Sequence, residues 1–147
     1  MSCSSLALLV PKVKRALQFI ASEYEDTFVL DILIDVFPQV MIDVNKNITV
    51  DESGNLSTPI EDDIASLLVL KASSAILYDK ASQLSAQAVK IKSGQQSIDI
   101  SNTASRVRDI IRERKSDYEA ALKRYFLKNK GSANSLVLER FRKYDLN

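Results

Sequence analysis

The feature that most constrains this chain is the segment from Thr27 to Met41, which is apolar on almost every side of a helix. Only Asp31, Asp35 and Gln39, spaced by four residues, form a polar stripe along it. A helix of this kind has to be covered by other helices or by another chain. Pro38 predicts a kink in the helix or its end. We interpret the two aspartates as a solvated edge, since nothing in the sequence would make one an acid and the other a base.

Three further segments have helical periodicity. The first, Leu8 to Ile20, has Pro11 in its first turn, where the missing N–H costs nothing. The second opens at Glu61 with three acidic residues, which the positive end of a helix dipole favours, and continues towards Ala88. The third runs from Thr103 to about Lys128 with heptad-like apolar spacing, which is interrupted at Arg114.

Two short segments favour strands instead. Residues Val89 to Ile100 alternate apolar and polar side chains on both sides of Ser93–Gly94, the pattern of a half-buried hairpin with a tight turn. A smaller hairpin is predicted where Ile48–Val50 can pair with Leu56 across Ser53–Gly54. The predicted fold is therefore mainly α: a small helical bundle with one short β-hairpin at about 89–100 in a domain over residues 1–130, followed by an extended C-terminal arm over 131–147.

Composition argues against catalysis. The 147 residues include no histidine and one cysteine, Cys3, in a segment predicted to be a loose N-terminus. Without histidine the chain has no His-containing zinc site and lacks the side chain most used for proton transfer near neutral pH. The three glycines fall at apparent turns and form no phosphate loop. We expect no enzymatic activity, no catalytic or metal-binding residues and no cofactor.

Nothing in the sequence indicates a membrane partner. The longest apolar stretch, Phe28 to Ile42, contains two aspartates and a proline and is too short to span a bilayer. The first apolar run, Leu6 to Val10, lacks the basic region of a signal peptide. We expect the protein to stay in the cell that makes it, or to leave as part of a particle.

Charge is divided between the two halves of the chain. Residues 1–70 carry eleven acidic and four basic side chains, a net charge of −7, and the remaining residues carry +8. Such halves can pair within a monomer or head-to-tail between copies, although ordinary surface variation would also produce the asymmetry. The candidate subunit-interface residues are Arg106, Arg112, Lys123, Arg124, Asp31, Asp35 and Asp62.

The last residues, Ser135 to Asn147, combine large apolar side chains with basic ones. Left in solvent, these side chains would form an exposed apolar patch on a small protein. We therefore predict an arm that becomes ordered on another chain. The alternative is a short final helix that folds back on its own bundle. The candidate docking residues of the arm are Leu136, Leu138, Phe141, Arg142 and Tyr144.

From Leu8 to Tyr125 the order of these elements resembles the head–tail connector, or adaptor, proteins of tailed bacteriophages. The most specific part is Lys90–Ser101, which reads Lys-Ile-x-x-Gly … Ser-Ile-Asp-x-Ser and leads into a helix. The acidic helix start Asp26–Asp31 and the helix end Asp117–Leu122 also fit.

The resemblance implies a structural virion protein without enzymatic activity, located in the neck between capsid and tail and made in the host cytoplasm. Its copies would form a ring, commonly of twelve, beneath the portal protein. A tail, stopper or terminator protein would dock on the far side, and DNA would pass through the centre without sequence-specific binding. In that family the C-terminal segment commonly reaches onto the portal. Here this segment departs from the pattern by being long and strongly basic.

Two other classes of function are open. The first is a basic helical nucleic-acid-binding protein that uses Arg106 to Lys130 and the tail on phosphates. Acidic residues interleave with those bases, which is more typical of a solvated helix face. The second, a hydrolase, would need a pair of carboxylates in a cleft, and no acidic pair stands out.

Overall fold

A computed structural model of the chain describes residues 2–90 and 95–129. The described residues are mainly helical and include a two-stranded antiparallel sheet, which confirms the predicted fold class. The elements in chain order are β1 (Ser2–Ser5), η1 (Leu6–Leu9), α1 (Val10–Leu17), η2 (Gln18–Glu23), α2 (Asp26–Asp43), β2 (Asn55–Glu61), α3 (Asp62–Lys90) and α4 (Gln95–Lys128), where η denotes a 3₁₀ helix. The predicted arm, 131–147, lies outside the described residues.

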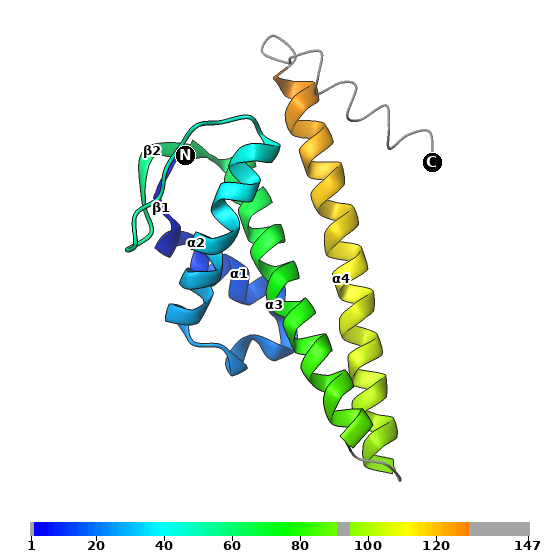
Figure 1. Ribbon diagram of the computed structural model, residues 1–147. Coiled ribbons are helices and arrows are strands. Elements are labelled where there is room, and N and C mark those ends of the chain that lie inside the picture. The colour runs from blue at the N-terminus through cyan, green and yellow to red at the C-terminus, as the bar shows by residue number, and fades with distance from the viewer. Residues whose placement is uncertain (1, 91–94, 130–147) are drawn as a thin grey trace.

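Helix α3 is the centre of the molecule (Figure 1). Helices α1 and α2 pack against it on one side, and α4 runs antiparallel along another side. At a rise of 1.5 Å per residue, α3 and α4 are about 43 Å and about 51 Å long. Because both are much longer than α1 and α2, the end of the pair where α3 finishes and α4 begins projects beyond the N-terminal bundle (Figure 1).

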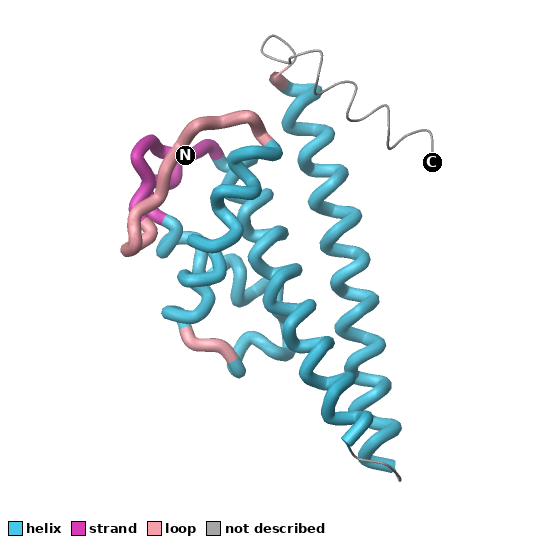
Figure 2. The backbone as a smooth tube through the Cα atoms, in the orientation of Figure 1, coloured by secondary structure: helices cyan, strands magenta, loops and turns pink. Residues whose placement is uncertain are grey.

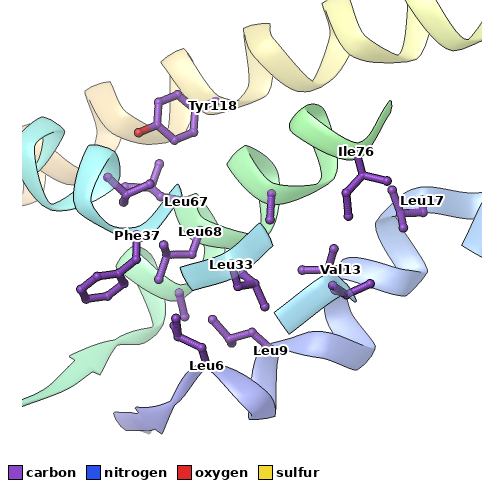
Figure 3. Packing of buried hydrophobic residues seen from close by; sticks show 14 of the residues in the cluster. Leu6, Leu9, Val13, Leu17, Leu33, Phe37, Leu67, Leu68, Ile76 and Tyr118 are labelled. Atoms are coloured by element: carbon purple, nitrogen blue, oxygen red, sulfur yellow. The ribbon is translucent and has the colours of Figure 1, made fainter. Parts of the chain in front are cut away.

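The hydrophobic core lies where α1, α2 and η1 meet α3 (Figure 3). From α2 come Val29, Leu33 and Phe37, which are almost completely buried and follow one another at steps of four residues. Burying each large apolar side chain stabilises the fold by about 1.5–3 kcal/mol. This core explains why α2 is apolar on most sides: the chain itself covers it with η1, α1 and α3.

Pro38 lies inside α2, and the helix continues to Asp43. Of the two alternatives predicted for Pro38, a kink or the end of the helix, the end is therefore wrong. The proline is exposed, while Val40 and Met41 in the following turn are buried in the core. Burial of these two side chains offsets the roughly 3 kcal/mol that a proline costs inside a helix.

The hairpin predicted at 89–100 is wrong where the structure describes it. Val89 and Lys90 end α3, and residues 95–100 already belong to α4; residues 91–94 lie outside the described residues. Four alternating residues are too few to distinguish a strand from a helix, and Ile100 also continues a helical spacing with Ala104 and Val107. Adding residues to an existing helix costs much less free energy than starting a new one, so the two long helices extend towards one another.

The two strands pair across a long stretch of sequence. β1 and β2 are antiparallel, with Cys3 opposite Ile60 and Ser5 opposite Asn55 (Figure 2). Cys3 is buried, and its thiol donates to the carbonyl oxygen of Ser5 at 3.0 Å. The prediction of a loose segment around Cys3 is therefore wrong, because strand pairing fixes it in place.

The small hairpin predicted around Ser53–Gly54 is confirmed. Val50 and Leu56 form an antiparallel bridge, and the Asp51 carboxylate accepts the backbone N–H groups of Ser53 at 2.9 Å and Asn55 at 2.8 Å. Gly54 has φ +85°, and a Cβ there would lie 3.0 Å from Leu30 Cδ1. The positive φ favours glycine at this turn, and a larger residue would in addition displace the end of the Leu30 side chain.

The first predicted helix, Leu8 to Ile20, is divided into η1, α1 and η2. Gln18 adopts φ 58° and so ends α1 after Leu17. The predicted apolar face is nevertheless correct, since Val10, Val13, Leu17 and Ile20 are all buried.

Candidate assembly surfaces

One side of α4 packs on α3, and no described helix or strand packs along the opposite side. Its buried side chains Ala104, Val107, Tyr118 and Tyr125 lie along one face of the helix, and Ile111 is half-buried between them. This is the heptad-like seam expected from the sequence. Most charged side chains of α4 lie at the remaining positions and are exposed, although Arg108 donates to Ser85 and Lys128 pairs with Asp63 on α3.

Arg114 interrupts this seam because it reaches a different element. One terminal nitrogen donates to the carbonyl oxygen of Ala16 near the end of α1 at 3.3 Å, and the other lies 3.9 Å from an Asp117 carboxylate oxygen. Its Nε is buried without a hydrogen-bond partner among the described residues. The carbonyls at the end of a helix favour a cation, so Arg114 links α4 to α1 across the bundle.

Tyr118 provides a second link, from α4 to α2. Its hydroxyl donates to the Asp43 carboxylate at 2.6 Å, and Gln39 donates to the other oxygen of that carboxylate at 3.2 Å. The Lys71 ammonium lies 4.9 Å from the centre of the Tyr118 ring, a cation–π distance. Arg114 and Tyr118 therefore fix how α4 sits relative to the N-terminal bundle.

The exposed charges of α4 are mostly basic. Over Asp99–Lys128, seven exposed side chains are basic and four are acidic. The last two turns, Ala120–Lys128, contain no acidic residue, and Leu127 among them is 51% exposed. We call Lys123, Arg124 and Leu127 the α4 patch.

The exposed side of α2 has the opposite character. Asp31 and Asp35 are exposed, one turn apart, and neither forms an ion pair or hydrogen bond with another described residue. Phe28 and Ile42, at either end of this stripe, are 39% and 65% exposed. We call these four residues the α2 stripe.

Other charges are paired within the chain. Lys14 lies 2.6 Å from Asp26, Lys80 pairs with Glu23, and the Lys128 ammonium lies 2.8 Å from an Asp63 oxygen.

The Lys128–Asp63 pair ties the end of α4 to the start of α3. Hydrogen bonding to Asp63 and the attraction of its carboxylate raise the pKa of Lys128 above its ordinary value. Burial raises the pKa of the Tyr125 hydroxyl, and the nearby Glu61 and Asp63 carboxylates raise it further. Pairing between the acidic and basic halves is thus partly intramolecular, and it uses Glu23 and Asp63.

The interface residues predicted from sequence separate into two groups. Asp31, Asp35 and Arg124 are exposed charges without a partner among the described residues. The remaining four already interact within the chain: Arg112 lies 3.5 Å from Asp109 on the same helix, and Asp62, Arg106 and Lys123 each have an interaction partner.

Asp31 and Asp35 have no partner among the described residues, so neither is paired with a basic candidate there. The α2 stripe and the α4 patch each lie opposite the buried face of their own helix, and the two helices pack on different sides of α3 (Figure 1). The arm residues proposed for docking lie outside the described part of the chain.

Sequence reasoning missed the apolar members of both surfaces. The apolar pattern of residues 27–41 does not distinguish Phe28 as exposed, and the predicted seam of the last helix does not include Leu127. Their position beside charged residues at helical spacing is the signal that could have identified them.

No set of three or more Cys, Asp or Glu side chains in residues 2–90 and 95–129 is arranged to hold a metal ion. Within the same ranges, no helix has the length and hydropathy needed to cross a bilayer. In comparisons with known proteins, the chain has no significant match to a family model, a curated protein or a solved structure.

Proposed function

We propose that this chain is a structural subunit that assembles with copies of itself into a ring, as a head–tail connector of a tailed bacteriophage does. The observation that carries the proposal is the separation of exposed charge: acidic on the α2 stripe and basic on the α4 patch, on two helices that pack on different sides of α3. A monomer with two complementary surfaces that cannot meet each other presents them to other copies.

The resemblance to connector proteins gives this proposal less support than the sequence alone suggested. Its most specific segment, Lys90–Ser101, is helical wherever it is described, rather than a hairpin. What remains is the order of the helices, including the Asp26–Asp31 start of α2 and the Asp117–Leu122 part of α4. The proposal therefore rests on the surfaces more than on the motif.

In the proposed assembly the ring, of about twelve copies as the resemblance implies, lies beneath a portal protein. A tail, stopper or terminator protein docks on the opposite side, and DNA passes through the centre without base-specific contacts. The proposed site of the protein is accordingly the neck of the virion. The assembly needs no catalytic residue, metal or cofactor from this chain.

Sedimentation velocity and negative-stain electron microscopy of the purified chain test this proposal, alone and with the portal protein encoded in the same genome. The expected result is a closed ring with a central opening, formed by the chain alone or on the portal. A chain that remains monomeric up to the highest soluble concentration and does not bind the portal would refute it.

Nucleic-acid binding is the second candidate, and it is favoured by the excess of exposed bases on α4. The Arg112–Asp109 and Arg114–Asp117 contacts weigh against it, because part of the basic charge is already neutralised within the helix. Retention on double-stranded DNA that decreases steeply with salt would support this candidate. The connector proposal predicts weak retention that does not depend on sequence.

A further inference from the structure

The α2 stripe is exposed, and only the Phe28 end of it is partly covered, where its ring stacks on Tyr24 with 5.3 Å between the ring centroids. Phe28, Asp31, Asp35 and Ile42 lie on the side of α2 opposite to Val29, Leu33 and Phe37, which face the core. We propose that this stripe binds the α4 patch, Lys123, Arg124 and Leu127, of a second copy of this chain. The inference rests on the proposed self-assembly and specifies the contact that produces it.

Charge complementarity is the first argument for this occupant. Asp31 and Asp35 are one helical turn apart, so their carboxylates lie on the same face of α2. The α4 patch presents two adjacent bases in a part of the helix without acidic residues. Glu119 lies one turn before Lys123, which already has an interaction within the chain, whereas Arg124 has no partner among the described residues and so contributes the available charge.

Apolar contact is the second argument. Exposed ion pairs contribute little to association by themselves, so a stable contact needs buried apolar area. Phe28 and Ile42 flank the two aspartates and are fourteen residues apart, which is about 21 Å along a helix. Leu127 follows the two bases by three and four residues, so both surfaces combine charge with an exposed apolar side chain.

The positions of the two surfaces determine the kind of assembly. Because the stripe and the patch are exposed on two helices that pack on different sides of α3, one copy can bind two others at the same time. Such a contact is heterologous, and repeated copies either close into a ring or continue as a filament. A two-fold symmetric dimer would have to pair the stripe and the patch of one copy with the patch and the stripe of the same partner, which requires both surfaces to face that partner. Helices α2 and α4 pack on different sides of α3, which favours contacts with two different copies.

The test uses charge reversal on each surface in the full-length protein. One variant carries Asp31→Lys and Asp35→Lys, and the other carries Lys123→Glu and Arg124→Glu. In each variant both surfaces have the same sign, so self-association measured by sedimentation velocity should weaken by about tenfold or more, because attractive exposed pairs become repulsive. Circular dichroism checks that both variants retain their helical content.

Mixing the two variants provides the decisive measurement. The basic α2 stripe of the first variant meets the acidic α4 patch of the second, and the unchanged surfaces also attract one another. An equimolar mixture should therefore recover association close to that of the unaltered chain, in assemblies where the two variants alternate. Failure of the mixture to recover would show that these two surfaces do not contact each other.

Matched controls change exposed charges elsewhere. Lys12→Glu with Lys46→Glu reverses two bases outside the patch, and Glu52→Lys reverses an acid outside the stripe. Both controls should associate like the unaltered chain. If they weaken association as much as the test variants do, net charge rather than a specific contact is responsible and the inference is wrong.

The remaining outcomes separate this inference from the proposed function. If the unaltered chain forms rings and both test variants do so equally well, the contact lies elsewhere and the connector proposal stands. If the unaltered chain never self-associates, with or without portal protein, both fail. If Lys123→Glu with Arg124→Glu abolishes retention on DNA but leaves association unchanged, the α4 patch binds nucleic acid and the docking inference is overturned.

Discussion

Replacing Tyr118 by phenylalanine should loosen α4 from the N-terminal bundle without disturbing the packing of the aromatic ring. The substitution removes one hydroxyl, which donates to the Asp43 carboxylate at 2.6 Å from a side chain that is 8% exposed. A hydrogen bond to a charged group contributes about 1.5–3 kcal/mol. Asp43 keeps its contact with Gln39, so we expect a loss near the lower end, about 1.5–2 kcal/mol.

Chemical denaturation followed by circular dichroism measures this loss as a lower midpoint with an unchanged slope. In a domain of this size the corresponding decrease in melting temperature is about 3–8 °C. A double-mutant cycle with Asp43→Ala isolates the pair, and we expect a coupling of about 1 kcal/mol or more because the two groups are in direct contact. Asp43 is the last residue of α2, where the helix dipole disfavours a carboxylate. Asp43→Ala alone should therefore lower the free energy of unfolding by less than Tyr118→Phe does.

Tyr78→Phe is the matched control, since Tyr78 is on α3 and is 68% exposed. Its free energy of unfolding should stay within about 0.5 kcal/mol of that of the unaltered chain. If Tyr118→Phe changes the free energy of unfolding as little as Tyr78→Phe does, or if the cycle gives a coupling below about 0.5 kcal/mol, the hydroxyl does not hold α4 in place. The fixed relation between the α2 stripe and the α4 patch would then lose one of the two contacts that support it.

Three further predictions concern other parts of the molecule. Arg114→Met should leave the free energy of unfolding within about 1 kcal/mol of its original value or raise it, because the unpartnered Nε no longer has to be buried. Urea denaturation measures this free energy, and a loss above about 2 kcal/mol would contradict the prediction. Hydrogen bonds from Asn55 hold the pKa of Asp51 below its ordinary value of 3.8. The contribution of ionised Asp51 to stability is therefore complete above pH 3.8 and is lost as the pH falls through the lower folded-state pKa. Asp51→Ala should flatten this part of the acid-unfolding curve, and an unchanged curve would show that Asp51 makes no such contribution. Truncation after Lys130 should leave the melting temperature unchanged and abolish binding to assembled portal, whereas unfolding of the shortened chain, or retained binding, would refute the docking arm.

Local chemistry determined much of this molecule directly from the sequence. The Ser53–Gly54 turn forms as expected because a glycine with positive φ and an aspartate that caps neighbouring N–H groups act within five residues. The buried faces of α1, α3 and α4 follow from spacings of three and four residues, which a helix converts into one side. The exposed positions of Asp31 and Asp35 follow from the same periodicity.

Tertiary structure decided the features in which distant residues compete or cooperate. Residues 89–90 and 95–100 are helical because they extend two helices that pack on each other, and this outweighs a short alternating pattern. Pro38 remains inside α2 because Val40 and Met41 gain burial beyond it. The pairing of Ser2–Ser5 with Asn55–Glu61 cannot be read from either segment alone, because a strand edge becomes satisfied only when the chain brings a partner to it.

The candidate surfaces divide in the same way. The sequence shows which residues are charged, but only packing shows that Glu23 and Asp63 are paired within the chain while Asp31 and Asp35 have no partner among the described residues. It also shows that Phe28, Ile42 and Leu127 stay exposed, because α2 and α4 each bury the opposite side in the core. Pairing and exposure depend on which elements meet in space, which the order of residues along the chain does not contain.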